Sequence, residues 1–216
     1  MIILFDLDGT LIESTEAITS TFQHTFNVHN ELNPKDEEIQ ELIGYPLDIM
    51  FTKLGVQESK IWDFVDTYKK KYRTISKIKT ELLPKAKEAV ALASSFAELG
   101  IVTTKTGLYS QELMEHFGLM HHFEVLIGRE HVQNPKPHEE PILNALKEFN
   151  CDKKEIWMIG DTKLDLISAK NAGVNSIGVL SGYDDEKTLK QFTNVIFSDA
   201  FEAVEFLKSR KISHTN

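Results

Sequence analysis

The chain has 216 residues and a formal net charge of −9, with 33 Asp and Glu against 24 Lys and Arg. An acidic protein binds nucleic acids and anionic lipid surfaces poorly, so we expect neither nucleic acid nor membrane as a partner. Hydrophobic residues make up 41% and charged residues 26%. This balance is typical of a globular domain, and the length suits one large domain or a core with a smaller insert.

Signals for export and for membrane insertion are missing from the sequence. No apolar run approaches the roughly 18 residues of a transmembrane helix, and the N-terminus has no basic region followed by an apolar one. Cys151 is the only cysteine, so an intrachain disulfide is excluded, which fits a reducing compartment. These features predict a cytoplasmic protein.

The chain opens with an apolar run, residues 1–5, that predicts a strand buried on both faces. Residues 14–83 then lack strand-like runs and show helical spacing, with the stripe Ile61, Val65, Tyr68 and Tyr72. We expect this segment to form a small helical domain that interrupts an α/β core.

Two local signals predict helix boundaries. Asn33, followed by Pro34, predicts a helix that begins with Asn33 as its N-cap. Pro84 predicts the start of another helix that runs to about Leu99, with Gly100 as its C-cap.

From about residue 99 onward, short apolar runs alternate with amphipathic stretches. The runs are 100–103, 123–128, 156–160, 175–180 and 194–197, and the stretches between them include 110–117, 140–149 and 164–172. Such alternation predicts an α/β fold with a mainly parallel, Rossmann-like sheet. The expected domains are a core of residues 1–13 with 84–216 and a helical domain of residues 14–83.

Two carboxylates follow the first strand, because Asp6 and Asp8 flank a single leucine ahead of Gly9 and Thr10. A carboxylate at the tip of a buried strand is costly to remove from water unless a metal ion, a ligand's donors or a lysine offsets its charge. An Asp-Gly pair after a strand is also an ordinary turn. This pair alone therefore leaves a functional and a structural interpretation open.

Later polar residues follow other strands. Thr103 and Thr104 close the second core strand, Lys136 lies between two prolines, and Asp161 and Asp165 follow the strand that ends at residue 160. The carboxyl ends of parallel strands line one crevice, so we expect these side chains to converge with the first two carboxylates.

Each of these residues has an ordinary alternative role. A threonine often closes a strand, a lysine between prolines is usually exposed, and an aspartate at a helix start often caps the helix or favours its dipole. Their occurrence together, in order and each near the end of a strand, favours a functional site. Carboxylate oxygens suit Mg²⁺, while Lys136 and Thr103 would add a charge and a hydroxyl donor for a phosphate.

These residues resemble the four motifs of the haloacid dehalogenase (HAD) superfamily of phosphatases. The motifs are DxDGT, a strand ending in Thr or Ser, a lysine often followed by proline, and GDxxxD. They lie here at residues 6–10, 101–103, 136–137 and 160–165. The helical segment lies where the family has a small cap domain, and residues 42–54 look like the cap of phosphoglycolate phosphatase-like members.

The resemblance implies a role for each motif residue. Asp6 would attack phosphorus and become an aspartyl phosphate. Asp8 would protonate the leaving group and later accept a proton from the hydrolytic water. Thr103, Thr104 and Lys136 would hold the phosphate.

The resemblance also implies Mg²⁺ as the cofactor. Asp6, Asp161 and the backbone carbonyl of Asp8 would ligate it, and Asp165 would either ligate it or orient a ligand. Asp8 argues against a dehalogenase, since such members lack the second aspartate, and Gly9 with Thr10 favours hydrolysis over a sugar-phosphate mutase reaction.

The cap would choose the substrate, with Glu13 and Tyr45 as candidate contacts. The resemblance implies that the substrate is a small phosphorylated metabolite, and 2-phosphoglycolate is the leading candidate. The alternative activities are those of a β-phosphoglucomutase-like sugar-phosphate mutase and of a pyrophosphatase. A phosphoacceptor signalling domain uses similar residues but lacks a large helical insert. We expect a monomer or a weak homodimer.

Overall fold

The computed structural model describes residues 1–150 and 156–213, so Cys151 lies outside the described residues. The chain separates into two compact units, Met1–Ile12 with Leu82–Asn216 and Glu13–Glu81. We call them the α/β unit and the helical unit. None of the described helices is long and apolar enough to cross a membrane.

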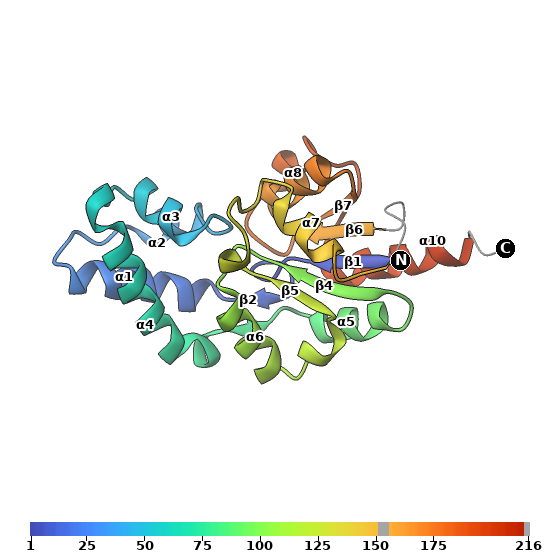
Figure 1. Ribbon diagram of the computed structural model, residues 1–216, viewed down its shortest axis with the longest axis horizontal. Coiled ribbons are helices and arrows are strands. Elements are labelled where there is room, and N and C mark those ends of the chain that lie inside the picture. The colour runs from blue at the N-terminus through green and yellow to red at the C-terminus, as the bar shows by residue number, and fades with distance from the viewer. Residues whose placement is uncertain (151–155, 214–216) are drawn as a thin grey trace. The chain divides into compact units, whose positions relative to one another are not determined.

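A six-stranded sheet forms the centre of the α/β unit (Figure 1). Every neighbouring pair in it is parallel. The spatial order is β5 (Val125–Ile127), β4 (Glu98–Val102), β1 (Ile2–Phe5), β6 (Ile156–Gly160), β7 (Asn175–Val179) and β8 (Ile196–Phe197). The predicted parallel α/β fold is thus confirmed, with strand ends that differ by one or two residues.

The order of the strands matters for the site. The chain builds the sheet outward from β1 through β4 and β5, then crosses back to β6 on the other side of β1. Ligands of doubly wound sheets bind outside the carboxyl ends of the strands at such a reversal. The carboxyl ends of β1 and β6 therefore mark the expected crevice.

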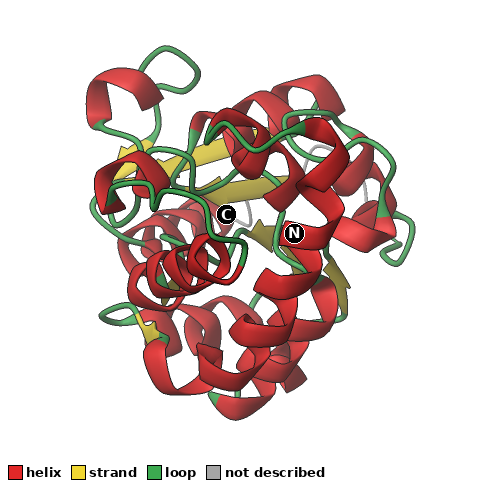
Figure 2. Ribbon diagram, turned by 90° about the vertical axis from the view of Figure 1, so that its left-hand side faces the viewer, coloured by secondary structure: helices red, strands yellow, loops and turns green. Residues whose placement is uncertain are grey.

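Helices cover both faces of the sheet because successive strand residues point to opposite sides. Ile3 and Phe5 of β1 pack into a core with α5 (Ala86–Ser94), α6 (Gly107–His116) and α10 (Ala200–Ser213). Ile2 and Leu4 pack into a second core with α7 (Glu140–Leu146) and α8 (Lys163–Ala172). In Figure 1, α7 and α8 lie above the sheet, and α5 and α6 lie below it. Figure 2 shows helices in red and strands in yellow from another side.

Short elements complete the α/β unit. They are the 3₁₀ turns η2 (Met120–His122) and η3 (Arg129–His131) and the helix α9 (Glu186–Leu189).

The helical unit contains α1 (Thr15–Val28), α2 (Asp36–Gln40), α3 (Leu47–Lys53), η1 (Glu58–Lys60) and α4 (Ile61–Lys79). Its core is aromatic: Phe22 of α1, Phe51 of α3, and Phe64 and Tyr68 of α4 lie in mutual ring contact. The predicted stripe of α4 is buried at all four positions. The helical character of this segment follows from that buried stripe.

Two predicted helix boundaries are wrong. α5 ends at Ser94, and Gly100 lies within β4 instead of capping a helix. A Cβ at Gly100 would lie 2.8 Å from Leu4 Cδ2 and 2.9 Å from Val125 Cγ1, so close strand packing requires this glycine. Asn33 is not an N-cap, since α2 begins two residues later than predicted, with Lys35 as its N-cap.

The two units are joined by a two-stranded sheet of β2 (Ile12–Glu13) and β3 (Glu81–Leu82). Just inside the α/β unit, Leu83 N donates to Leu11 O at 3.0 Å. The chain thus leaves and rejoins the α/β unit at neighbouring points.

Candidate active site

Three buried carboxylates meet at the carboxyl ends of β1 and β6. Asp6 follows β1, while Asp161 and Asp165 follow β6, and each offers an oxygen within 4.8 Å of the others. Their exposed fractions are 4%, 0% and 0%. Since Phe5 pairs with Ile159 in the sheet, strand register brings Asp6 beside the loop that carries Asp161. The predicted convergence of these residues is therefore present.

Lys136 lies inside this carboxylate cluster. Its Nζ is 2.9 Å from Asp6 Oδ1 and 2.5 Å from Asp165 Oδ1, and it donates to Val102 O at 3.0 Å. The Lys136 side chain is only 2% exposed. This lysine is thus a buried cation that joins the ends of β1 and β4 to the start of α8.

The charges within the cluster shift the pKa values of its members. Burial raises the pKa of Asp6 to about 7, the charge of Lys136 opposes this rise, and the charges of Asp165 and Asp8 add to it. Burial and then the charges of Asp165 and Asp6 raise the pKa of Asp161 well above its usual value. Burial lowers the pKa of Lys136, but Asp165 and Asp6 raise it more, so Lys136 stays charged.

These residues fit a divalent cation. Three carboxylates surround one ammonium, so the cluster has an excess of negative charge that a cation would offset. Asp6 Oδ1 is buried and, among the described residues, has no donor with hydrogen-bond geometry, although Lys136 lies close to it. Such an oxygen is available as a metal ligand, and hard oxygen ligands suit Mg²⁺.

The other two carboxylates differ in how they are held. Asp165 Oδ1 faces Lys136, and its Oδ2 accepts hydrogen bonds from Thr162 N at 3.0 Å and Thr162 Oγ1 at 2.7 Å. Both oxygens of Asp165 are thus engaged by the protein. Asp161 accepts from Thr10 Oγ1 at 2.8 Å and from Tyr183 N at 3.0 Å.

Two glycines leave room for Asp161. A Cβ at Gly9 would lie 2.3 Å from Asp161 Oδ2, and one at Gly182 would lie 2.0 Å from the same oxygen. Gly9 also has φ +80°, a conformation that favours glycine. The DxDGT glycine is therefore required both by the turn and by the space that Asp161 occupies.

Thr103 lies directly after β4 and is 4% exposed, while Thr104 is half-buried. Thr103 N donates to Ile127 O at 2.9 Å, and its hydroxyl oxygen accepts from Lys105 N at 3.2 Å. The structure thus places Thr103 at the same edge of the sheet as Asp6, since β4 and β1 are neighbours.

Asp8 pairs with a residue that was not predicted. Lys105 Nζ lies 3.0 Å from Asp8 Oδ1, and the two side chains are 9% and 12% exposed. Lys105 stands two residues after Thr103, in the loop that follows a strand next to β1. That position was the one available signal, because a residue this close to the end of β4 must lie near the loop after β1.

Glu13 and Tyr45, the candidate substrate contacts, belong to the helical unit. Glu13 is exposed, and its Oε1 accepts from Thr15 N at 2.8 Å. Tyr45 is half-buried, with Lys53 Nζ 5.1 Å from its ring centroid. Their contact with substrate stays a prediction.

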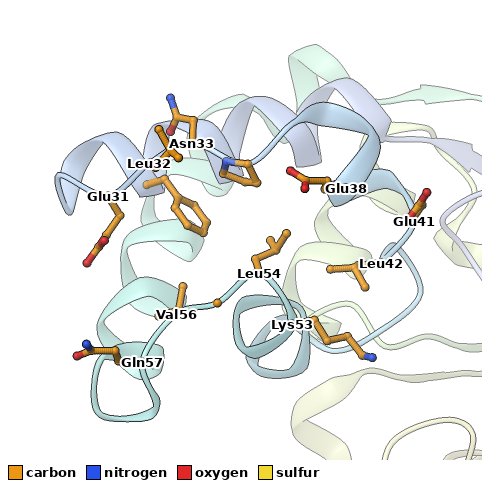
Figure 3. Close-up of a pocket in the computed structure, with 13 residues that line it drawn as sticks. Glu31, Leu32, Asn33, Glu38, Glu41, Leu42, Lys53, Leu54, Val56 and Gln57 are labelled. Atoms are coloured by element: carbon orange, nitrogen blue, oxygen red, sulfur yellow. The ribbon is translucent and has the colours of Figure 1, made fainter.

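The helical unit also has a pocket of 780 Å³ (Figure 3). Glu31, Leu32, Leu54 and Val56 are among the residues around it. No predicted site residue lines this pocket.

Comparison with known proteins agrees with this geometry. The family model for haloacid dehalogenase-like hydrolases matches residues 3–179. The chain belongs to this family. The family match confirms the resemblance and the phosphatase prediction, and it covers all the clustered residues of the α/β unit.

Named relatives and solved structures lie in the same family. Pyrophosphatase PpaX of Bacillus pumilus is 36% identical over 87% of this chain and 86% of its own length. Pyrophosphatase PpaX of Halalkalibacterium halodurans is 34% identical over 88% of each chain. A haloacid dehalogenase-like family hydrolase from Streptococcus pneumoniae superposes with a TM-score of 0.85 at 26% identity, over 95% of this chain and 97% of the other.

Proposed function

We propose that the protein is a Mg²⁺-dependent phosphohydrolase that forms a phosphorylated Asp6 and acts on inorganic pyrophosphate. The observation that carries the mechanism is Asp6 Oδ1, a buried carboxylate oxygen beside Lys136 that has no hydrogen-bond donor among the described residues. The charge of Lys136, 2.9 Å from this oxygen, favours the ionised form of Asp6, which is the form that attacks phosphorus or binds a metal ion.

In the first step, a carboxylate oxygen of Asp6 attacks phosphorus. The bond from phosphorus to the leaving oxygen breaks, and that oxygen takes a proton from Asp8. Lys136 and Thr103 stabilise the negative phosphoryl oxygens, Lys136 as a fixed cation and Thr103 as a hydroxyl donor. The products of this step are aspartyl phosphate at Asp6 and the protonated leaving group, which is orthophosphate when the substrate is pyrophosphate.

In the second step, water attacks the phosphorus of the aspartyl phosphate. Asp8, now a carboxylate, accepts the proton of this water, and the bond from phosphorus to Asp6 breaks. Orthophosphate leaves, Asp6 is again a carboxylate, and Asp8 is again protonated. The enzyme thus returns to its starting state after one net hydrolysis.

Asp6, Asp161 and the backbone carbonyl of Asp8 would hold Mg²⁺. Bound there, Mg²⁺ would offset the charge of the cluster and of the phosphate. Asp165 would act as a positioning residue, because its Oδ1 faces the ammonium of Lys136 and its Oδ2 accepts two hydrogen bonds from Thr162. Each oxygen of Asp161, in contrast, accepts one hydrogen bond from a neutral donor, which leaves a lone pair for a metal ion. This arrangement favours a role for Asp165 in orienting the metal ligands over direct ligation of the metal.

Pyrophosphate leads as the substrate because two relatives at 34% and 36% identity bear the name pyrophosphatase. 2-Phosphoglycolate remains the second candidate, supported by the resemblance of residues 42–54 to the cap of phosphoglycolate phosphatase-like members. The family match favours either hydrolysis over a phosphoacceptor signalling role. Cytoplasmic location and a monomeric or weakly dimeric state remain predictions.

The test is phosphate release from pyrophosphate, 2-phosphoglycolate and β-glucose 1-phosphate, with Mg²⁺ and with EDTA. We expect the highest kcat/KM for pyrophosphate, no turnover in EDTA, and recovery when Mg²⁺ is restored. Rapid quenching with labelled substrate should label Asp6, and Asp6→Asn should remove both label and turnover. Turnover that persists in full chelation, or without Asp6, contradicts the mechanism.

A further inference from the structure

Lys105 is a second lysine at the site, and the mechanism above does not use it. Its Nζ lies 3.0 Å from Asp8 Oδ1, and its side chain is 9% exposed. Lys136, in contrast, contacts Asp6 and Asp165. The two lysines thus contact different carboxylates: Lys136 contacts the proposed nucleophile, Asp6, and Lys105 contacts the proposed acid, Asp8.

The backbone of Lys105 is held from both sides. Lys105 N donates to Thr103 Oγ1 at 3.2 Å, and Lys105 O accepts from Arg129 N at 2.9 Å. Gly128 permits the second contact, because a Cβ there would lie 2.9 Å from Lys105 O. With its backbone held and its ammonium paired with Asp8, the Lys105 side chain is positioned before a ligand binds.

The position of Lys105 relative to the reaction follows from its contact with Asp8. Asp8 must reach the oxygen of the leaving group in order to protonate it, within hydrogen-bond distance. The ammonium of Lys105 contacts the same carboxylate, so it lies within reach of the leaving group that Asp8 protonates. An ammonium has three N–H donors, so it can hold Asp8 and a substrate oxygen at once.

We propose that Lys105 determines specificity by binding the anionic part of the leaving group. The inference rests on the proposed function and adds the substrate class. Pyrophosphate and 2-phosphoglycolate both have a negative charge on the leaving group. In pyrophosphate it is on the second phosphoryl group, and in 2-phosphoglycolate it is on the carboxylate. An ester with a neutral leaving group offers Lys105 no such partner.

The experiment compares substrates that differ in this charge. Pyrophosphate and 2-phosphoglycolate have anionic leaving groups, and 2-hydroxyethyl phosphate is the neutral counterpart of 2-phosphoglycolate. The variants are Lys105→Met and Lys105→Arg, with Lys190→Met as the matched control. Lys190 pairs with Glu186 in an exposed ion pair outside the site, so this control removes one charge without touching the cluster.

For Lys105→Met we expect kcat/KM to fall by about 10- to 100-fold on both anionic substrates, the value of a hydrogen bond between charged groups. On 2-hydroxyethyl phosphate it should fall by no more than about 3-fold, since no such bond is lost. Lys105→Arg should restore part of the loss. The anionic substrate whose kcat/KM falls more in Lys105→Met is the one whose leaving group Lys105 binds.

Two results would overturn the inference while leaving the proposed function intact. One is an equal loss on all three substrates, which would mean that Lys105 acts only through Asp8. The other is a wild-type enzyme that hydrolyses 2-hydroxyethyl phosphate as well as it hydrolyses both pyrophosphate and 2-phosphoglycolate, a measurement that decides the question even if Lys105→Met fails to fold. Failure of the proposed function is distinct, because the wild type would then form no phosphorylated Asp6 with any substrate.

Discussion

The hydroxyl of Thr10 donates to Asp161 Oδ1 at 2.8 Å, across 151 positions of the sequence. This bond joins the loop after β1 to the loop after β6, and both side chains are buried. The nucleophile and the proposed metal ligand therefore keep a fixed spacing, since each loop restrains the other. Preorganisation of this kind is what electrostatic catalysis requires.

The space around Asp161 gives a first prediction. Gly182→Ala would place a methyl group 2.0 Å from Asp161 Oδ2, so the carboxylate must move away from its present position. We expect Mg²⁺ affinity to fall by about 10-fold or more, as for a displaced ligand shell, while the fold persists. Titration calorimetry measures the affinity.

The control for this prediction is Gly118→Ala. Gly118 has φ +70° and nothing within 4 Å of its missing Cβ, so its replacement strains the backbone away from the site. It should lower the free energy of unfolding by about 1–2 kcal/mol without changing Mg²⁺ affinity. Equal affinities in both variants would show that Asp161 does not bind the metal.

Asp8 gives a prediction about rate. Asp8→Asn removes the proposed proton donor, so kcat on pyrophosphate should fall by roughly 10²- to 10⁴-fold. Formation of phosphorylated Asp6 should slow much less on p-nitrophenyl phosphate, whose leaving group departs without protonation, although the second step loses its base with either substrate. Single-turnover release of the leaving group from the two substrates measures this first step, and an equal loss on both would remove Asp8 from the acid role.

Lys136 gives a prediction about stability. Lys136→Met would leave Asp6 and Asp165 buried without the ammonium that contacts both. Breaking a buried ion pair from one side costs about 3–5 kcal/mol, so the free energy of unfolding in urea should fall by that amount at neutral pH in EDTA. Lys190→Met is the exposed control, and its loss should stay within about 1 kcal/mol.

Asp6 gives a prediction about pH. Its pKa is raised from 3.8 to about 7 in the metal-free protein, so the folded state binds a proton that the unfolded state has released. The stabilisation from this proton is complete below the unfolded pKa and is lost as pH rises toward 7. In EDTA, wild type should therefore lose stability relative to Asp6→Asn between about pH 4 and pH 7.

Thermal unfolding of wild type and Asp6→Asn across this range measures the difference. Mg²⁺ should reverse the loss in wild type at neutral pH, because a ligand that binds only the folded state stabilises it. Asp6→Asn, which lacks one proposed ligand, should respond less. A constant difference between the two proteins across the range would contradict the raised pKa.

The sheet was predictable because its strands are short apolar runs that alternate regularly with amphipathic stretches. The end of α5 was not, because residues 95–99 continue a helix-like apolar spacing into β4. Local spacing predicts Gly100 as a helix end, whereas the structure requires glycine there because Leu4 and Val125 of the neighbouring strands leave no room for a Cβ. Contacts between strands are not visible in local spacing.

The carboxylates and Lys136 were predictable in the same way, from polar residues after apolar runs. The pair of Lys105 with Asp8 was not, because it depends on which strands are neighbours and on where a long side chain points. The two engaged oxygens of Asp165 likewise became visible only in three dimensions. Strand order, more than residue type, carries this information.

The pairing of β2 with β3 has a consequence for the history of the chain. A segment whose two ends meet can be shortened, lengthened or exchanged without stretching the structure that hosts it. Here the ends of residues 13–81 meet beside Leu11 and Leu83. Proteins descended from one ancestral gene can therefore keep the same cluster of carboxylates and lysines while their inserted segments diverge.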